Sequence, residues 1–457
     1  MLVLGLGETG LSLARYLNAQ GARLRIADSR LDPPGIATLR REMPQADVHC
    51  GPFSDELLQG VDRIAISPGV PLAEPFVQRA IARDIPVEGD IELLAQQLAT
   101  NNYRQNTKVI AITGANGKTT VTSMVGAMCA AAGLDTQVAG NISPAVLDAL
   151  RARSSQPQVW VLELSSFQLE TTYSLEADAA AVLNITEDHL DRYAGSMEAY
   201  ATAKARIFHG HGVQILNRED ARSTAMRIDG RKQMSFGLNS PVGENDWGIA
   251  REGMETWLMQ GKQKILCAEE LQVSGMHNVA NALAALALCR SLGMPLQPLV
   301  RALKAFKGLP HRVEKVAEVN GVTYYDDSKG TNVGATEAAL KGLGKPAIVI
   351  LGGDGKGQDF SPLKEAVAKH ARAAVLIGRD GPLIGEALQG CGKPVLKALD
   401  MDEAVMIATA NAQAGDAVLM SPACASFDMY KSYLHRAEVF IAAVKKLQME
   451  APCSVQH

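Results

Sequence analysis

The sequence lacks the features of a disulfide-stapled, zinc-ribbon or membrane-spanning protein. Among its 457 residues are seven cysteines, at positions 50, 129, 267, 289, 391, 424 and 453, and they form no CxxC pair. This usage supports neither a disulfide framework nor a zinc ribbon, and it favours a reducing cytoplasm. The longest apolar stretch, around residues 279–289, is too short to cross a bilayer, and the initial sequence MLVLGLGETG has no export signal. We therefore expect a cytoplasmic protein without membrane insertion.

A large excess of charge of either sign is also missing. The chain carries 45 Lys and Arg residues against 49 Asp and Glu residues, a formal net charge of −4. Nucleic acid is therefore not expected as a partner, although a local basic pocket for phosphate is compatible with this balance. Hydrophobic residues make up 47% of the chain, which excludes wholesale disorder. Glycine is in excess, with 41 residues, and predicts backbone loops that turn tightly or approach ligands.

Short β-rich apolar runs alternate with helix-length amphipathic segments along the chain. Residues 2–4 are followed by 11–18, and residues 108–112 by 120–132. This alternation predicts an α/β fold built from βαβ units with parallel sheets. The composition shifts at the polar stretch 99–106 and again at GLPHR, residues 308–312. We predict three domains, 1–99, 100–308 and 309–457, each long enough to bury its own core.

The first glycine loop has the pattern of a dinucleotide-binding turn. Gly5, Gly7 and Gly10 follow an expected strand and open a helix, and Asp28 follows a second expected strand. In this arrangement the glycines allow close backbone approach, and the helix N-terminus attracts a pyrophosphate. NAD(P), another nucleotide diphosphate and a purely structural turn all remain compatible with this loop.

The second glycine loop, TGANGKTT at residues 113–120, predicts ATP binding. Its backbone N–H groups are expected to cradle phosphates, with Lys118 reaching the β and γ phosphates and the Thr119 hydroxyl available to Mg²⁺. The loop is shorter than a full Walker A sequence, because Ile112 stands where the first glycine would be.

Three polar positions follow in the central part of the chain. Glu163 ends the apolar run VWVLE, where nucleotide sites place a second Mg²⁺ contact, and His189 lies among acids after another apolar run. We favour a metal role for His189 over that of an ordinary polar residue. Lys204 lies on a predicted helix face that otherwise carries alanine, and the residue by itself predicts an ordinary solvated lysine.

Three loops of the last third follow expected strands. They are DDSKGTN at 326–332, GGDGKG at 352–357 and SPACASFD at 421–428. Open α/β sheets bind ligands at the carboxyl ends of their strands, so these loops predict a ligand edge. Cys424 and Ser426 lack the context of a covalent nucleophile, which disfavours covalent catalysis.

Together, TGANGKTT, ELSSFQLE, TEDHLDRY, HNVANALAA, GLPHR, DDSKGTN, GGDGKGQDF and SPACASFD resemble the Mur ligase family along the whole chain. The resemblance implies a Rossmann-like N-terminal domain for a UDP-sugar, a P-loop-type central ATPase domain and a Rossmann-like C-terminal domain for an amino acid. The implied activity is ATP-dependent addition of D-glutamate to UDP-N-acetylmuramoyl-L-alanine through an acyl phosphate, in peptidoglycan precursor synthesis. A monomer that uses two Mg²⁺ ions and a carbamylated lysine is expected.

The resemblance also implies roles for individual residues. Lys118, His189 and Lys204 correspond to the catalytic set, Lys204 being the carbamylated lysine. Metal ligands would be Thr119, Glu163, His189 and Lys204. The nucleotide would be bound by Gly114, Ala115, Asn116, Gly117, Lys118, Thr119, Thr120, Asn281, Arg312 and Asp327. Substrates would be bound by Thr9, Ser29, Arg30, Ser67, Gly69, Asn141, Ser165, Lys329, Thr331, Lys356, Ser426, Phe427 and Tyr433.

The sequence departs from the family pattern at Tyr433, where phenylalanine is common, at Ala437, where glycine is usual, and at Ser29, where threonine is common. Three alternatives remain. Another Mur ligase would share the ATPase, but the DNPR-like sequence of the diamino-acid-adding members is missing. A folylpolyglutamate synthase-like ligase would not begin with a separate GxGxxG domain, and an NAD-dependent dehydrogenase explains only the first loop.

Overall fold

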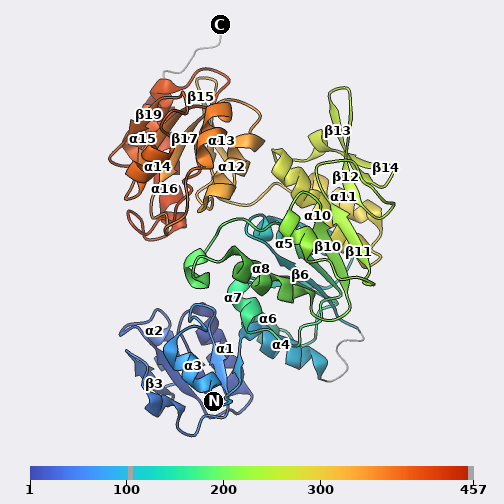
Figure 1. Cartoon of the computed structure of the whole chain (residues 1–457), viewed down its shortest axis with the longest axis vertical. Helices are drawn as coiled ribbons and strands as arrows, with labels where there is room; N and C mark the ends of the chain where they lie inside the picture. The colour runs from blue at the N-terminus through green and yellow to red at the C-terminus, as the bar shows by residue number, and fades with distance from the viewer. Residues whose placement is uncertain (101–105, 451–457) are drawn as a thin grey trace.

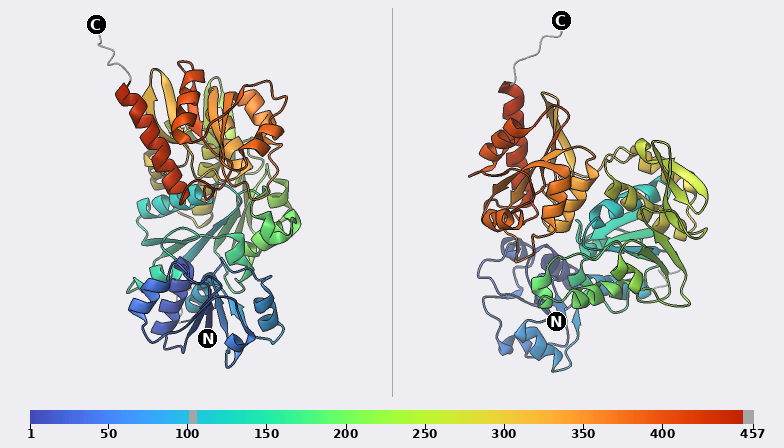
Figure 2. Two further views of the ribbon diagram at one scale, coloured as in Figure 1. Left: turned by 90° about the vertical axis from the view of Figure 1, so that its left-hand side faces the viewer. Right: turned by 45° about the horizontal axis from the view of Figure 1, so that its top comes forward.

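The structure is a computed structural model that describes residues 1–100 and 106–450. Residues 101–105, which belong to the first predicted boundary, and Cys453 lie outside the described residues. Three β-sheets follow one another along the chain, and each carries helices on its faces (Figures 1 and 2). This confirms the predicted α/β class. In the described part of the chain, every helix is too short or too polar to span a lipid bilayer.

The first sheet consists of five parallel strands. In spatial order they are β3 (Asp47–Cys50), β2 (Arg25–Asp28), β1 (Leu2–Leu4), β4 (Ile64–Ile66) and β5 (Val87–Glu88). Its helices are α1 (Glu8–Ala19), α2 (Ile36–Glu42) and α3 (Pro75–Ile81). The strand order reverses at β1, so the glycine loop after β1 lies at the point where open α/β sheets bind ligands.

The central sheet has nine strands and contains the second glycine loop. In spatial order they are β14 (Gln263–Cys267), β13 (Glu255–Gln260), β12 (Trp247–Glu252), β11 (Gln233–Phe236), β10 (Val213–Asn217), β9 (Ala179–Val182), β6 (Lys108–Thr113), β8 (Val159–Glu163) and β7 (Thr136–Gly140). The pairs β12–β13 and β13–β14 are antiparallel, and the other pairs are parallel. Its helices are α5 (Lys118–Ala131), α6 (Val146–Arg151), α7 (Ser166–Glu170), α8 (Met197–Ala205), α9 (Ala221–Ala225), α10 (Met276–Ser291) and α11 (Leu296–Ala305).

Strand β6 explains why the central strands are apolar throughout. Val109 and Ala111 enter the hydrophobic core on one face of the sheet, whereas Ile110 and Ile112 enter the core that α5, α10 and α11 form on the other face. Because successive side chains of a strand point to opposite faces, a strand buried on both sides reads as one continuous apolar run.

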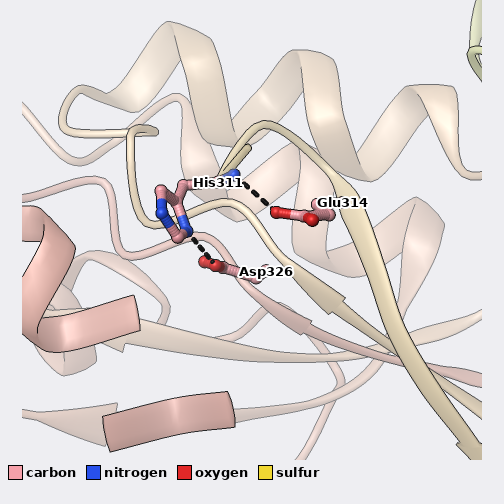
Figure 3. Close-up of side chains that lie close together, drawn as sticks. All are labelled: His311, Glu314 and Asp326. Atoms are coloured by element: carbon pink, nitrogen blue, oxygen red, sulfur yellow. Dashed lines mark hydrogen bonds and ion pairs between the residues drawn. The ribbon is translucent and has the colours of Figure 1, made fainter. Parts of the chain in front are cut away.

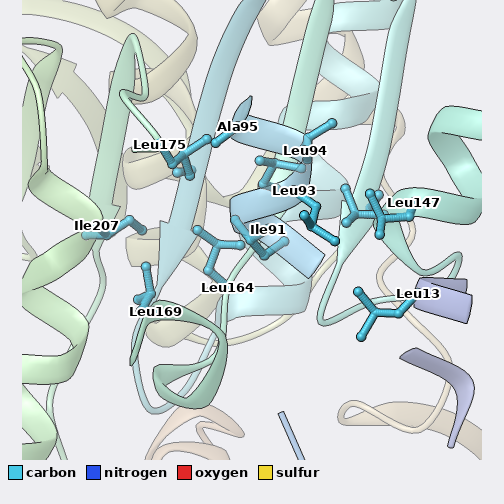
Figure 4. Close-up of a cluster of buried hydrophobic side chains, with 14 of the residues drawn as sticks. Leu13, Ile91, Leu93, Leu94, Ala95, Leu147, Leu164, Leu169, Leu175 and Ile207 are labelled. Carbon is cyan, nitrogen blue, oxygen red and sulfur yellow. The ribbon is translucent and has the colours of Figure 1, made fainter. Parts of the chain in front are cut away.

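Helix α4 (Asp90–Ala99) connects the first sheet to the second. Its side chains Ile91, Leu94 and Ala95 lie in one hydrophobic cluster with Leu13 of α1 and Leu147 of α6 (Figure 4). Arg15 of α1 adds a polar contact across this junction with Asp148 of α6, at 2.9 Å. The first and central sheets are therefore held together by a shared core.

The third sheet has six strands and packs between two further cores. In spatial order they are β15 (Glu314–Val319), β16 (Val322–Asp326), β20 (Ala417–Met420), β17 (Ala347–Gly352), β18 (Ala371–Ile377) and β19 (Val395–Lys397), with only β15–β16 antiparallel among these pairs. Its helices are α12 (Val333–Gly342), α13 (Leu363–His370), α14 (Gly381–Ala387), α15 (Met401–Asn411) and α16 (Tyr433–Glu450). The three predicted ligand loops follow β16, β17 and β20, which are neighbours in this sheet.

Candidate active site

The loop between β6 and α5 has the shape of a phosphate cradle. Gly114 has φ +152° and Gly117 has φ +84°, conformations that side chains with a Cβ rarely adopt. A Cβ on Gly117 would stand 2.6 Å from Oδ1 of Asn281 on α10. Asn184, which follows β9, fixes the loop by accepting from the backbone N–H groups of Ala115 and Asn116, at 2.9 and 2.8 Å. The loop is therefore fixed at the N-terminus of α5, a position where anions bind.

Two lysines converge on this loop. The Nζ of Lys118 donates to the carbonyl oxygens of Gly114 and Ala115, at 2.9 and 2.8 Å. The Nζ of Lys204, on α8, donates to the same Gly114 carbonyl at 2.9 Å and to the Thr113 hydroxyl at 3.3 Å. Burial lowers the pKa of both lysines, and for Lys204 the Lys118 cation adds to a large decrease. Lys204 is only 2% exposed, so it is not the solvated surface lysine that its sequence suggests by itself.

Glu163 ends β8 next to the loop and is 1% exposed. Its Oε1 accepts a 2.8 Å hydrogen bond from Nδ2 of Asn141, whereas its Oε2 has no hydrogen-bond partner among the described residues. A buried carboxylate oxygen without a partner is costly unless a ligand satisfies it. Oxygen donors are also what Mg²⁺ prefers, so the donor chemistry of Glu163 and of the Thr119 hydroxyl fits that of magnesium ligands.

His189 belongs to the loop before the short helix η3 (Leu190–Tyr193). It has φ +55°, its Nε2 lies 3.5 Å from Oδ1 of Asp188, and its side chain is 41% exposed. Partial desolvation lowers its pKa. Its ring contacts the edge of Phe167 at 5.3 Å between centroids. Arg192 lies over the same Phe167 ring, 4.1 Å from its centroid, and donates to the carbonyl oxygen of Pro68 at 3.3 Å. The loop between β9 and η3, which carries His189, is called the histidine loop below. Through this stack the first sheet contacts the histidine loop.

The predicted residues of the first sheet lie around its switch point. Ser67 is buried against Gly5, whose added Cβ would stand 2.9 Å from that of Ser67. The carboxylate of Asp28 accepts from Arg30 at 2.8 and 2.7 Å and from the backbone N–H of Leu6 at 2.6 Å. Thr9 lies in the first turn of α1, Ser29 follows β2, and Gly69 follows β4 in an exposed turn. Asp28 is therefore already occupied by Arg30, which disfavours it as a ribose ligand.

The third sheet meets the phosphate loop directly. Arg312 donates through Nη2 to the Thr119 hydroxyl at 2.7 Å, and Asn332, the N-cap of α12, donates through Nδ2 to Oδ1 of Asn116 at 3.1 Å. A cavity of about 190 Å³ lies at this junction. It is lined by, among others, Asn116, Gly117, Thr120, Asn281, Arg312, Asp327 and Lys329. Burial raises the pKa of Asp327 to about 7 and lowers that of Lys329 to about 8.

A second cavity, of about 510 Å³, lies between the histidine loop and the third sheet. Asp188 and His189 line one side, and Thr331 and Lys356 line the other. Three other residues predicted to bind substrate, Ser426, Phe427 and Tyr433, line neither cavity. Ser426 is buried and Phe427 is 73% exposed. The centroid of the Tyr433 ring lies 3.9 Å from the Nζ of Lys329. Ser165 forms a capping box with Gln168 at the start of α7.

Sequence reasoning missed several residues that the structure places at these junctions. Asn332, Phe167 and Arg192 lie inside the quoted sequence patterns, and only their three-dimensional partners distinguish them from their neighbours. His311, Glu314 and Asp326 also gather beside the first cavity, with potential ligand atoms within 4.8 Å of one another (Figure 3). Their atoms are already joined by hydrogen bonds, from His311 Nδ1 to Asp326 and from the His311 backbone N–H to Glu314.

Three models of Mur ligase domains match the chain. They are the MurD-like N-terminal domain over residues 1–89, the Mur ligase middle domain over 112–289 and the Mur ligase glutamate ligase domain over 311–424. The UDP-N-acetylmuramoylalanine–D-glutamate ligase of Nitrosospira multiformis is 57% identical over 453 residues, covering 98% of this chain and 95% of the relative. The enzyme of the same name from Nitrosomonas europaea is 54% identical over 464 residues, covering 100% and 98%.

Solved structures share the fold at lower identity. UDP-N-acetylmuramate-alanine ligase from Thermotoga maritima has a TM-score of 0.60 at 20% identity and covers 98% of this chain and 99% of its own. A pseudomurein peptide ligase type C from Methanothermus fervidus has a TM-score of 0.61 at 18% identity, with the same coverage. All three domain models match, and full-length relatives are more than 50% identical. These matches agree with the site, where a phosphate loop, a buried carboxylate and two lysines converge. The chain therefore belongs to the Mur ligase family.

Proposed function

We propose that this chain is an ATP-dependent carbon–nitrogen ligase that joins D-glutamate to UDP-N-acetylmuramoyl-L-alanine and releases ADP and phosphate. The observation that carries the proposal is the full-length match, above 50% identity, to enzymes of that name. The arrangement of the site supports it, because the first cavity adjoins the phosphate loop, and His189 lines the second cavity together with Thr331 and Lys356.

The chemistry begins with a carboxylate that is a poor acylating agent, because its charge repels nucleophiles and oxide is a poor leaving group. Transfer of the γ-phosphoryl group to the alanine carboxylate creates an acyl phosphate with a good leaving group. Lys118 and Arg312 surround the phosphate loop with positive charge, which suits a reaction that depends chiefly on positioning and electrostatic stabilisation. The N–H groups of residues 114–120 would hold the β phosphate, and Asn281 would contact the adenine.

Thr119, Glu163, His189 and Lys204 would hold two Mg²⁺ ions, which neutralise charge on the phosphates when bound. The pKa of the buried Lys204 amine is strongly lowered, so the neutral form that can react with CO₂ is favoured. That reaction forms a carbamate, releases one proton and converts the amine into the anionic oxygen ligand that a hard metal prefers. The unpaired Oε2 of Glu163 supports the same assignment.

The amine of D-glutamate would attack the acyl carbon from the second cavity, where Lys356 and Thr331, which line it, would bind its carboxylates. A tetrahedral intermediate then collapses with loss of phosphate. Ser426, Phe427, Tyr433 and Lys329 would complete the amino-acid pocket. These four residues lie outside the second cavity in this structure, so we expect the third sheet to move when they approach the bound amino acid. That movement would also exclude water from the acyl phosphate.

The nucleotide-sugar would bind to the first sheet through Thr9, Ser29, Arg30, Ser67 and Gly69, with Asn141 and Ser165 continuing the contact toward the phosphate loop. The Arg30–Asp28 pair favours this assignment over a dinucleotide, whose ribose would need Asp28. We further propose domains at 1–99, 100–308 and 309–457, a monomeric state and a cytoplasmic location.

Phosphate release, measured with a panel of amino acids, tests the proposal. Release should require UDP-N-acetylmuramoyl-L-alanine and D-glutamate together, and L-alanine, diamino acids, L-glutamate and D-alanyl-D-alanine should be inactive. Release with another acceptor or another amino acid, and none with this pair, would overturn the assignment.

A further inference from the structure

The segment that enters the third sheet has an unusual backbone. His311 has φ +61° and Val313 has φ +48°, and neither is glycine. The left-handed region is disfavoured for residues with a Cβ, above all for a β-branched one such as valine. Two such residues on either side of Arg312 persist only where the surroundings hold them.

Glu314, which accepts from the backbone N–H of His311 at 2.8 Å, and two adjacent acids at the end of β16 hold them. His311 Nδ1 lies 2.6 Å from Oδ2 of Asp326 (Figure 3). The backbone N–H of Val313 donates to Oδ1 of Asp327 at 3.3 Å. The carbonyl of His311 accepts from the backbone N–H of Lys329 at 3.2 Å. Residues 311 and 313 are therefore both attached to the third sheet.

Arg312, between these two anchors, extends in the other direction. Its Nη2 donates to the Thr119 hydroxyl at 2.7 Å, and its side chain lines the first cavity, where the nucleotide is proposed to bind. Among the described residues, the hydrogen bond of the Arg312 side chain goes to Thr119, whereas its links to the third sheet are its backbone neighbours and the charge of the nearby Asp327 carboxylate. The direction of its guanidinium therefore depends on how firmly residues 311 and 313 are fixed.

We propose that His311 and Asp326 form a positioning pair that aims Arg312 at the bound nucleotide. Asp326 is completely buried and the His311 side chain is 18% exposed, so the contact is shielded from water. The second carboxylate oxygen of Asp326 accepts from the backbone N–H of Ser328 at 2.9 Å, which fixes the carboxylate. The inference rests on the proposed binding of ATP at the phosphate loop, and neither residue needs to contact the nucleotide.

A double-mutant cycle on nucleotide binding tests this pair. His311→Asn removes the ring that reaches Asp326 but keeps a residue that tolerates the left-handed backbone. We expect it to weaken binding of the non-hydrolysable analogue β,γ-imido-ATP with Mg²⁺ by about tenfold, the effect of losing one charge-assisted hydrogen bond. Asp326→Ala should weaken binding similarly. Glu314→Gln, which keeps an oxygen for the backbone N–H of residue 311, serves as the matched control and should bind as wild type.

The decisive comparison uses an Arg312→Ala background. If the pair acts through Arg312, adding His311→Asn to Arg312→Ala causes no further loss of affinity, measured by calorimetry. Losses that multiply, or a His311→Asn protein that binds the analogue as wild type, would overturn the proposal. Melting temperatures identify variants with general damage, and His311→Asn carries the test if Asp326→Ala does not fold. Because no acceptor or amino acid is present, the result does not depend on which amino acid is ligated.

Discussion

Substitution of Lys204 by methionine should affect catalysis much more than the stability of the fold. In a Lys204→Met protein the new side chain fills nearly the same buried volume, and the substitution removes two hydrogen bonds of Nζ, to Gly114 and Thr113. Their removal costs about 1 kcal/mol each, and the absence of a buried amine offsets part of that cost. The free energy of unfolding should therefore change by no more than about 1 kcal/mol. Lys204→Ala also removes a buried aliphatic stem, and we expect it to destabilise the fold by about 2–4 kcal/mol.

Activity should behave differently from stability. Without the lysine no carbamate can form, and phosphate release by the Lys204→Met enzyme should fall by about 100-fold, the upper end of the usual cost of removing a group that supports a catalytic metal. Acetate or propionate should restore part of the activity in Lys204→Ala, whose cavity can admit a carboxylate, and should not restore it in Lys204→Met. Urea unfolding and a phosphate-release assay measure the two quantities. A Lys204→Met enzyme with full activity would refute the carbamate assignment.

Three further substitutions test individual contacts. Burial raises the pKa of Asp90 to about 6 from 3.8, so its ionised form destabilises the fold, and the free energy of unfolding should fall as pH rises from about 4 to 6. Asp90→Asn should remove this pH dependence and raise the free energy of unfolding by up to about 3 kcal/mol at pH 7, measured by urea unfolding at each pH. A pH-independent difference from wild type would contradict this. Gly342→Ala places a Cβ 2.5 Å from Nδ1 of His277 across the α10–α12 contact, and should displace the third sheet, seen as a changed distance between spin labels on α5 and α15. An unchanged distance would show that His277 simply moves aside. Gly117→Ala meets Asn281 at 2.6 Å with φ +84°, and should abolish ATP-analogue binding in calorimetry while the protein still unfolds cooperatively.

The α/β class and the strand-loop positions were predictable because they depend on local pattern. Residues 417–420 form β20 as the apolar run predicts, and the loop 113–120 joins a strand to a helix. Long-range contacts were not predictable in the same way. Asp326 and Asp327 are adjacent in the sequence, and only the structure shows that the first contacts His311 while the second accepts from Val313 and Ser421.

Other residues needed the fold before their setting could be understood. A lysine on a helix is by default interpreted as solvated, yet α8 packs against the phosphate loop and buries the Lys204 amine. Helix α4 falls in the predicted first domain, but its apolar face shares a core with α6 because the second sheet covers it. Pocket residues such as Phe427 depend on the placement of the whole third sheet, which no local pattern encodes.

Substrate dependence of phosphate release tests the central claim most directly. The purified enzyme is supplied with ATP, Mg²⁺ and UDP-N-acetylmuramoyl-L-alanine, and D-glutamate is added last. We predict that phosphate release begins on that addition, that one dipeptide product forms for each ATP consumed, and that L-glutamate in its place gives no product. Equal turnover with another amino acid, or none with D-glutamate, would contradict the account.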